Sequence, residues 1–384
     1  MRSAVELARH LSMGSRNATH ATALPVDRFL DQIGEIAALA VSQYGNVHFF
    51  DTFEGKRIVT RLEHIPNSFV TQGPLSFAHM KSNRVTKRRL DLPTLGVAIA
   101  ILTAFLLWSL AFTRLPLWIA APIGSLLLAW YGSLQHETIH GHPTPSKRIN
   151  ALIGGAPLSL WIPYAIYRET HIRHHRHSGR RLTEVGHDPE SFYLAPDDVA
   201  KASGLRRLLL QANCTLAGRL SIGPLLAITT FWVGSARQLR SSPKHRLIWL
   251  RHVIAVASVV AWTRGICHIP LIDYLLLVVY PSAAITNLRS FAEHRANDDS
   301  PARTNVVEAG GFWSLLFLNN NLHVAHHAHP HIPWYELPAV WRGMRESSPG
   351  AGLIFTRGYL EVCRQYLFRR FITPEHPFIQ ARRQ

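Results

Sequence analysis

Three histidine clusters in this chain have the residue types and spacing of metal ligands. Two of the clusters place histidines at positions i, i+3 and i+4: His171, His174 and His175, and then His323, His326 and His327. On a helix, residues with this spacing leave from one face, about one turn apart. Neutral imidazole binds iron, zinc, copper and nickel well. The repeated spacing therefore predicts a transition-metal site.

A shorter cluster, His136 and His140, also lies one helical turn apart. Letter for letter it is the H-E-x-x-H motif of zinc peptidases, in which Glu137 would act as the general base. A zinc peptidase needs only one further ligand and an open position, so it would leave the two longer clusters unused. Pro143 also stands where the extended zincin pattern has a glycine. The peptidase is kept as the more distant alternative.

A ninth candidate ligand, His294, comes soon after the last apolar run and is expected at a helix end, as His140 is. Glu293 is placed to orient an imidazole from beside it. Near the second cluster, the carboxylates available for the same task are Glu169, Glu184 and Asp188. The histidines that flank the clusters are interpreted as hydrogen-bonding or surface residues: His142, His177, His329 and His331.

Nine histidines are more than one tetrahedral zinc can use. They would serve two metals, each with about four or five nitrogen ligands and an open position for oxygen. Two irons that activate O2 toward an inert C–H bond fit this description, and that chemistry belongs to the metals themselves. The three cysteines lie far apart, without the spacing of an iron–sulfur centre, so electrons must come from an external donor.

The elements that must position these ligands are long apolar segments. Four apolar runs are predicted as membrane-spanning helices: Leu95–Thr113, Leu117–Leu134, Leu247–Trp262 and Ile269–Ile285. The first is an uncharged run long enough to cross a bilayer core of ~30 Å. The third and fourth runs contain groups that are costly in lipid: Arg251, His252 and Asp273. Turns are expected at Arg114–Pro116 and at Arg264–His268. The basic residues between Lys81 and Arg89 should stay in the cytosol, which places every histidine cluster on the cytosolic side.

The predicted fold is an all-α integral membrane protein of about four transmembrane helices, with a cytosolic helical cap that holds a His-rich di-iron site. Residues 1–90 are expected to form a cytosolic extension of unknown function, with a helix at Pro25–Gln43 and a possible alternative start at Met80. Residues 91–345 form the membrane domain and residues 346–384 a cytosolic tail. Within the basic loop 141–246, two apolar stretches are expected as interfacial helices: Leu152–Tyr167 and Ile222–Gly234.

The chain carries a net charge of +17. Such a charge suits nucleic acid, an anionic membrane surface or an acidic protein partner. No nucleic-acid motif accompanies it, and the apolar runs favour the membrane. The arginine-rich stretch from Arg168 to Arg181 suggests an acidic, ferredoxin-like electron-transfer protein as a partner.

The three clusters resemble the histidine boxes of the membrane fatty acid desaturase family. The resemblance extends from about Leu95 to Arg342 and includes Glu293-His294-Arg295. It implies four spans with a cytosolic di-iron cap, O2 as oxidant and a lipid-like substrate, with His294 as the extra ligand. The family has an asparagine one turn before that histidine, where it supports a metal-bound water, whereas this chain has Ser290.

The resulting prediction is an O2-dependent di-iron desaturase that removes two hydrogens from an acyl chain carried as acyl-lipid, acyl-CoA or another acyl carrier. A di-iron lipid or alkyl hydroxylase would use the same ligands and is the first alternative. We expect a multi-pass protein of the plasma membrane, or of the inner membrane in a bacterium, with its active site on the cytosolic face.

Overall fold

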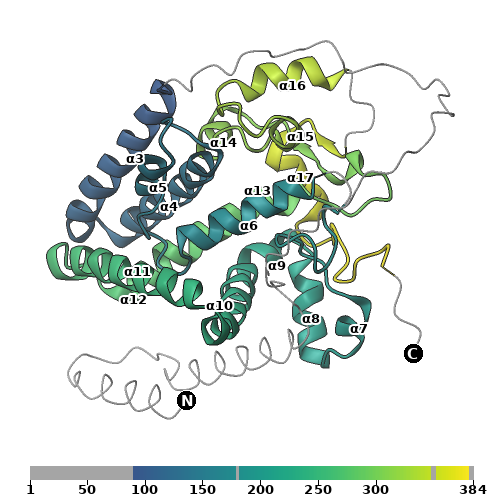
Figure 1. The fold of residues 1–384 in the computed structure, drawn as a ribbon, viewed down its shortest axis with the longest axis horizontal. Coiled ribbons are helices and arrows are strands. Elements are labelled where there is room, and N and C mark those ends of the chain that lie inside the picture. The colour runs from purple at the N-terminus through teal and green to yellow at the C-terminus, as the bar shows by residue number, and fades with distance from the viewer. Residues whose placement is uncertain (1–89, 179–180, 347–351, 380–384) are drawn as a thin grey trace, which may run out of the picture.

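A computed structural model describes residues 90–178, 181–346 and 352–379 of the chain. The helix expected at Pro25–Gln43, the proposed start at Met80 and the basic residues from Lys81 to Arg89 lie outside the described residues. The described part is mostly helical, as predicted from the sequence. In Figure 1, α3, α4 and α11 lie on one side of the molecule, and α7 and α8 lie on the other.

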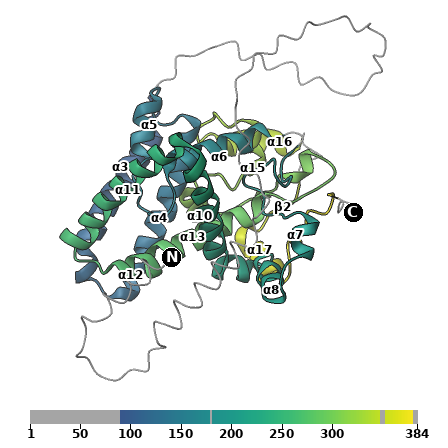
Figure 2. The same ribbon diagram turned by 60° about the horizontal axis from the view of Figure 1, so that its bottom comes forward.

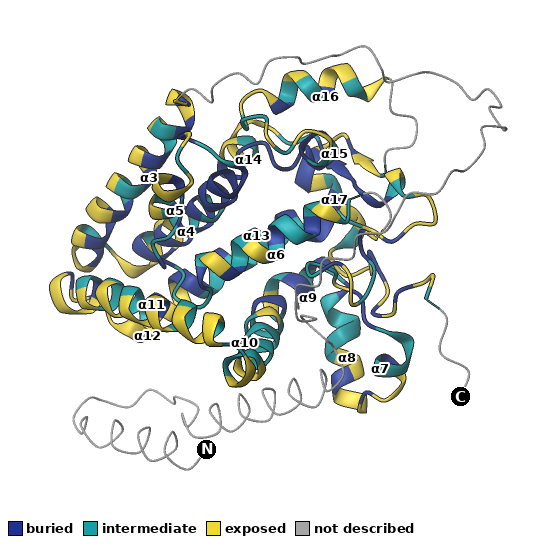
Figure 3. Ribbon diagram, viewed as in Figure 1, coloured by how far each residue is buried: buried dark blue, intermediate teal, exposed yellow. Residues whose placement is uncertain are grey.

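Four helices are long and apolar enough to cross a membrane: Leu92–Arg114, Leu117–His140, Pro243–Ile266 and Leu271–Glu293. The first span consists of α3 (Leu92–Ala111) and η1 (Phe112–Arg114), and the second is α4 (Leu117–His140). The third span consists of α11 (Pro243–Val260) and η2 (Ala261–Ile266). The fourth consists of α12 (Leu271–Asp273), η3 (Tyr274–Val279) and α13 (Tyr280–Glu293). Their outer faces carry exposed leucines and isoleucines. Figure 3 shows the exposed positions along α3, α11 and α12 in yellow. The four predicted spans are thus confirmed as apolar helices.

The central helix of the bundle is α4, which packs against both α3 and α13. The start of α3 is fixed by Asp91, whose side chain accepts hydrogen bonds from the backbone N–H and the hydroxyl of Thr94. On the shared face of α3 and α4, the indole of Trp108 donates a 2.8 Å hydrogen bond to the carbonyl of Ala120 and lies directly over Gly124. The absence of a side chain at Gly124 therefore sets the distance between the two helices.

The remaining elements form a cap at one end of the spans, which Figure 2 shows from a second direction. They are α5 (Lys147–Ile153), α6 (Tyr164–Arg176), α7 (Pro196–Ala200), α8 (Gly204–Asn213), α9 (Leu216–Ser221), α10 (Gly223–Ser241), η4 (Pro301–Arg303), β1 (Val306–Val307), α14 (Gly311–Leu316), α15 (His323–Ala328), α16 (Leu337–Arg345), β2 (Ile354–Phe355) and α17 (Gly358–Tyr366). The two short strands pair in parallel and are the single addition to the all-α prediction within the described residues.

Two local predictions need correction. The helix expected at Leu152–Tyr167 is wrong, because residues 154–163 form turns between the end of α5 and the start of α6. Glycines 154 and 155 and prolines 157 and 163 disfavour a continuous helix there. The turn expected at Arg264–His268 lies later, because helical residues continue to Ile266. The second of the two stretches, Ile222–Gly234, is helical and forms the first part of α10.

The described part of the predicted tail packs against the cap. The backbone of Leu194 pairs with the chain at Pro374 and His376, and the N–H of Phe371 donates to the carbonyl of Cys214. Phe371 and Ile372 are buried in the same cluster as Phe291 of α13. The segment after α17 therefore packs against both the cap and the end of α13.

Candidate metal centre

The first histidine pair sits in the last turns of α4. His136 and His140 are buried, with 1% and 8% of their surfaces exposed. The helix stops immediately after them because Gly141 adopts the left-handed conformation, with φ of 100°, and its N–H returns to carbonyls of the last turn. The predicted continuation of the second span into this cluster is therefore correct.

The other candidate ligands come from three further elements. α6 carries His171, His174 and His175 on one face, and the six-residue α15 carries His323, His326 and His327. His294 is the first residue after α13, where the backbone turns extended. Four elements that are distant in the sequence thus bring nine imidazoles to one place.

The nine histidines form two groups whose nitrogens could each hold a metal ion. The five-histidine group contains His136, His140, His171, His175 and His326. The four-histidine group contains His174, His294, His323 and His327. Within each group one ring nitrogen per residue lies within 4.8 Å of those of the others. The structure therefore brings together every histidine that the sequence singled out as a ligand.

In both groups it is the Nε2 atoms that converge. In the five-histidine group, the Nε2 of His171 lies 3.0 Å from that of His140 and 3.1 Å from that of His175. In the four-histidine group, the Nε2 of His323 lies 3.0 Å from that of His294 and 3.1 Å from that of His327. The two groups are adjacent, since the rings of His175 and His327 stack with centroids 4.4 Å apart.

The opposite ring nitrogens are held by the surrounding chain. The Nδ1 of His174 lies 2.8 Å from a carboxylate oxygen of Asp188, and the Nδ1 of His171 lies 2.9 Å from Oε1 of Glu190. A carboxylate in this position fixes the ring orientation and the tautomer, which leaves the Nε2 lone pair for a metal. Of the three carboxylates expected to do this, Asp188 is confirmed.

Two other groups complete the support on the Nδ1 side. The hydroxyl of Ser178 lies 2.8 Å from the Nδ1 of His327, and the side-chain oxygen of Asn320 lies 3.0 Å from the Nδ1 of His323. Glu293 lies 3.5 Å from the same Nδ1 of His323 and forms an ion pair with Arg289. The predicted supporting position of Glu293 beside an imidazole is therefore present.

The expected roles of Glu169 and Glu184 are wrong. Glu169 faces outward and pairs with Lys244 at 2.9 Å, while Glu184 lies 3.8 Å from Arg303. Glu190 instead orients the imidazole of His171. Its position two residues after Asp188 is the sequence signal that could have indicated this role. The backbone N–H of Glu190 donates to Asp188, so one tight turn presents both carboxylates to α6.

Burial keeps most of these imidazoles neutral. It lowers the pKa of His175 to about 2 and, with the neighbouring His174, the pKa of His294 to about 3. The pKa of His326 also falls well below its ordinary value, mainly through burial. At His174 burial acts in the same direction, but the carboxylates of Glu190 and Asp188 outweigh it and raise the pKa to about 9. The charge of a bound cation would take the place of that proton.

The donor set fits a pair of transition-metal ions. Several buried, neutral Nε2 atoms at about 3 Å from one another present lone pairs to a common point, which is unfavourable unless a cation or shared protons lie between them. Sulfur ligands are absent from both groups, which suits iron or zinc bound by imidazole. Iron bound there would supply the activation of O2, and the five-histidine and four-histidine groups would hold one ion each.

The zinc-peptidase alternative is disfavoured by the position of Glu137. Its carboxylate accepts a hydrogen bond from the backbone N–H of Trp334 and lies 3.6 Å from the Nδ1 of His136. It is therefore on the side of the ring away from the converging Nε2 atoms, where a general base would not reach a metal-bound water. The chain provides the H-E-x-x-H letters without the geometry of that active site.

The flanking histidines serve mainly as structural contacts. His142 lies 2.8 Å from the carboxylate of Asp91 and its other nitrogen lies 3.1 Å from the carbonyl oxygen of His331, so it ties the start of α3 to the loop before α16. His177 follows α6 as its C-cap, and His329 is exposed. None of the four belongs to either group of converging nitrogens among the described residues.

Comparison with known proteins agrees with this geometry. The profile of the family described as "Fatty acid desaturase" matches residues 112–359, which include all nine histidines. The chain belongs to the fatty acid desaturase family. It is thus a membrane oxidoreductase, and the family context implies a lipid or acyl substrate.

Two curated proteins illustrate the range of this family. A beta-carotene ketolase from Paracoccus sp. (strain PC1) is 26% identical over 255 residues, covering 62% of this chain and 85% of the ketolase. A chloroplastic omega-6 fatty acid desaturase from Spinacia oleracea is 22% identical over 281 residues, covering 67% of this chain and 60% of the desaturase. The chain therefore matches less than two thirds of the spinach enzyme's length.

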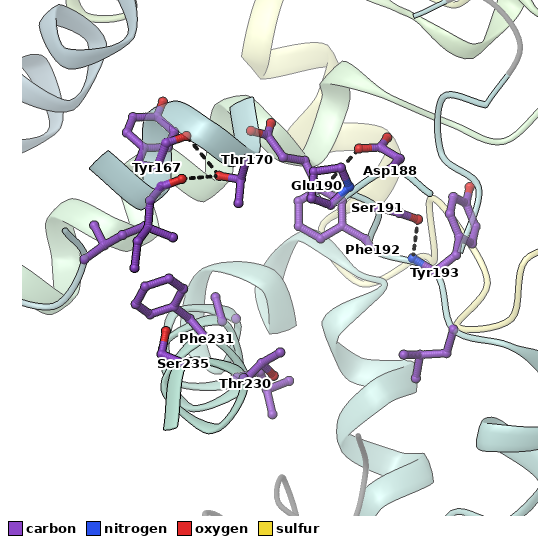
Figure 4. A pocket seen from close by; sticks show the side chains of 18 of the residues that line it. Tyr167, Thr170, Asp188, Glu190, Ser191, Phe192, Tyr193, Thr230, Phe231 and Ser235 are labelled. Atoms are coloured by element: carbon purple, nitrogen blue, oxygen red, sulfur yellow. Dashed lines mark hydrogen bonds between the residues drawn. The ribbon is translucent and has the colours of Figure 1, made fainter. Parts of the chain in front are cut away.

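A cavity of about 390 Å³ lies against the metal centre. It is lined by residues of α6, α9 and α10 and by the loop that carries Asp188 and Glu190, whose carboxylates also hold His174 and His171. Figure 4 shows Tyr167 and Thr170 of α6 on one side of the cavity and Phe231 of α10 on another. This cavity places a binding space directly beside the carboxylates that orient the candidate ligands.

Proposed function

We propose that this protein is an O2-dependent di-iron enzyme that desaturates an acyl chain, with the nine histidines as its iron ligands. The observation that carries the proposal is the convergence of the Nε2 atoms into two adjacent groups of five and four. Family membership supports the same chemistry. Iron would supply the oxidation of the C–H bond, and the two histidine groups would each hold one metal ion.

The proposal includes an orientation and a donor. The cap faces the cytosol, where a soluble electron-transfer protein delivers electrons. Arg176 and Arg181 are exposed on the surface next to α6, which suits an acidic ferredoxin-like partner. Turnover with such a donor should weaken steeply with ionic strength, because steering by surface charge is screened over about 10 Å at 0.1 M salt.

A hydroxylating enzyme is the second candidate, and the similarity to a ketolase favours it. Loss of a second hydrogen gives a double bond, whereas return of a hydroxyl gives an alcohol, and both begin with removal of one hydrogen from a methylene. The ligand set described here serves either outcome. Analysis of lipids from a host that expresses the protein would distinguish a new double bond from a new hydroxyl or keto group.

Metal analysis of the detergent-purified protein tests the proposal directly. We expect about two irons and little zinc per chain, together with an oxidised lipid in the expressing host. One zinc without iron would contradict the proposal and lead to peptidase assays that compare the native protein with Glu137→Gln. Two irons with neither a double bond nor an oxygenated lipid would support the metal centre and exclude lipid oxidation.

A further inference from the structure

A buried arginine lies in the wall of the cavity described above. Most of the wall is apolar and includes Trp161, Ile162, Leu226 and Phe231. Arg219, on α9, also lines this space, with only 2% of its surface exposed. A guanidinium in such an apolar setting requires an explanation, because a charge removed from water is costly unless it is paired.

The contacts of Arg219 satisfy its guanidinium only in part. Its Nε donates to the carbonyl of Asn213 at 3.1 Å, and its Cζ lies 4.0 Å from the ring centroid of Phe192, which also lines the cavity. Its Nη1 is buried and has no hydrogen-bond partner among the described residues. The cation–π contact compensates a fraction of the lost hydration.

Two other buried arginines of the described chain, Arg289 and Arg303, have acidic partners, whereas Arg219 forms no ion pair with a described residue. Arg289 pairs with Glu293 at 2.8 Å and Arg303 lies 3.8 Å from Glu184. Around Arg219 the ionisable neighbours are Cys214 and Tyr193, both of which are neutral at pH 7. Burial lowers the pKa of Arg219 only to about 10, so its side chain remains a cation.

We propose that the cavity binds an amphiphile with an anionic head group, whose carboxylate pairs with Arg219 while its chain lies along the apolar wall. An incoming carboxylate would give the buried guanidinium the partner that the described chain does not provide, through charge-assisted hydrogen bonds. This inference rests on the proposed function and deepens it, because it selects an acidic lipid over a neutral hydrocarbon as the ligand of the enzyme.

The experiment measures binding of a fluorescent polyene fatty acid, cis-parinaric acid, and of its methyl ester to the full chain in a neutral detergent. A pH of about 8 keeps the carboxyl ionised, since its ordinary pKa is ~4. In the native protein, palmitate should displace bound parinarate at a concentration roughly tenfold lower than hexadecanol does, which corresponds to one charge-assisted contact. Equal displacement by the acid and the alcohol would overturn the proposal.

Two variants separate the charge of Arg219 from a general effect on the fold. Arg219→Met keeps the side-chain length and should weaken parinarate binding at least tenfold while leaving the methyl ester within about twofold. Arg207→Met removes an exposed arginine of α8 that does not line the cavity, and it should bind both probes as the native protein does. Equal loss of acid and ester binding in Arg219→Met would show a structural role and contradict the proposal.

Further controls test for a small-anion site and for a folding defect in the variant. Acetate should not displace parinarate at the concentrations at which palmitate does, and displacement by acetate alone would reduce the site to a small-anion site and overturn the proposal. If Arg219→Met fails to fold in a thermal scan, Arg219→Lys keeps the charge and should retain the preference for the acid. Iron content and lipid oxidation are measured separately, so an active di-iron enzyme that lacks the acid preference would refute this inference and leave the proposed function intact.

Discussion

At the level of single residues, the two carboxylates of the Asp188–Glu190 turn hold the Nδ1 atoms of His174 and His171 in the candidate centre. Glu190 reaches both histidine groups, since its Oε1 lies 2.9 Å from the Nδ1 of His171 and its Oε2 lies 3.9 Å from the Nε2 of His174. Glu190 therefore lies beside one histidine of each group, and Asp188 lies closer to His174, at 2.8 Å from its Nδ1.

The variant Glu190→Gln should weaken iron binding. The neutral amide keeps the size of the side chain but removes the charge that orients and polarises His171, and loss of such a partner typically costs about 10–100-fold in metal affinity. Iron per chain after dialysis against a graded chelator is the measurement. Glu169→Gln, which alters an exposed glutamate paired with Lys244, is the control and should retain iron like the native protein.

Removal of His294 tests whether a lone histidine belongs to the centre. His294→Ala leaves the four-histidine group with three nitrogens, so we expect the iron content to fall from about two toward one per chain, because the five-histidine group is untouched. His329→Ala removes an exposed histidine outside both groups and should keep both irons. Full iron content in His294→Ala would exclude it as a ligand.

The ligands could be predicted from the sequence, whereas one of their main supports could not. Residues spaced at i, i+3 and i+4 lie on one face of a helix, so the histidines of α6 and α15 could be identified as ligands without tertiary information. Glu190 lies 19 positions after His171 in the sequence, and its approach to that histidine depends on how the chain after α6 packs. The sequence likewise could not indicate that Arg219 is buried, because its position beside the ring of Phe192 depends on tertiary packing.

At the level of helices, the contact between α3 and α4 depends on one glycine. A methyl group at Gly124 would overlap the indole ring of Trp108, whereas a methyl group at Gly96 of α3 would meet nothing within 4 Å. Gly124→Ala should therefore lower stability by about 1–3 kcal/mol, the usual cost of overpacking. Thermal unfolding in detergent is the measurement, with Gly96→Ala as the matched control that should unfold close to the native temperature.

The helix boundaries that the sequence missed have local physical causes. Apolar composition predicted Leu152–Tyr167 as one helix, but the backbone of residues 154–163 follows turns and includes Leu160 at φ of 65°. Composition reports burial, and it does not distinguish a buried turn from a buried helix when glycine and proline interrupt the run.

The same turn also explains how α11 tolerates His252 in an apolar span. The Nε2 of His252 lies 3.0 Å from the carbonyl oxygen of Leu160.

On the scale of the whole molecule, the segment after α17 couples the C-terminal end of the described chain to the cap through His376. Burial, together with Arg303, lowers the pKa of His376 below its ordinary value of ~6.5, and its Nδ1 accepts the N–H of Phe378. The unfolded chain therefore binds a proton here more readily than the folded protein. Stability should fall as pH drops through ~6.5 toward the lowered value, and should be independent of this group above that range.

His376→Gln should reduce the part of the pH dependence that comes from this site. We expect the unfolding temperature of the native protein to fall more between pH ~7.5 and ~5.5 than that of the variant, since glutamine does not titrate. Both proteins are measured loaded with iron, so that the nine candidate ligands contribute equally. An unchanged pH dependence would show that His376 has its ordinary pKa in the folded protein.

The orientation of the whole molecule follows from where its charge lies relative to the spans. At the end opposite the cap, the two turns between described spans expose few cations, such as Arg114 and Arg264, while the cap carries most of the described arginines and lysines. Positive charge near span ends is retained in the cytosol, so the cap and both histidine groups should face inward.

Labelling of single introduced cysteines in intact cells tests this orientation. Thr113→Cys lies in the exposed turn after α3, and Lys201→Cys lies on the exposed surface of the cap after α7. A membrane-impermeant maleimide should label the first before permeabilisation and the second only after it. The native cysteines are buried or half-buried, and the unmodified protein provides the background. The reverse pattern would place the metal centre outside the cytosol, where a soluble cytosolic ferredoxin could not reach Arg176 and Arg181, and the proposed donor would have to be replaced by one on the other side.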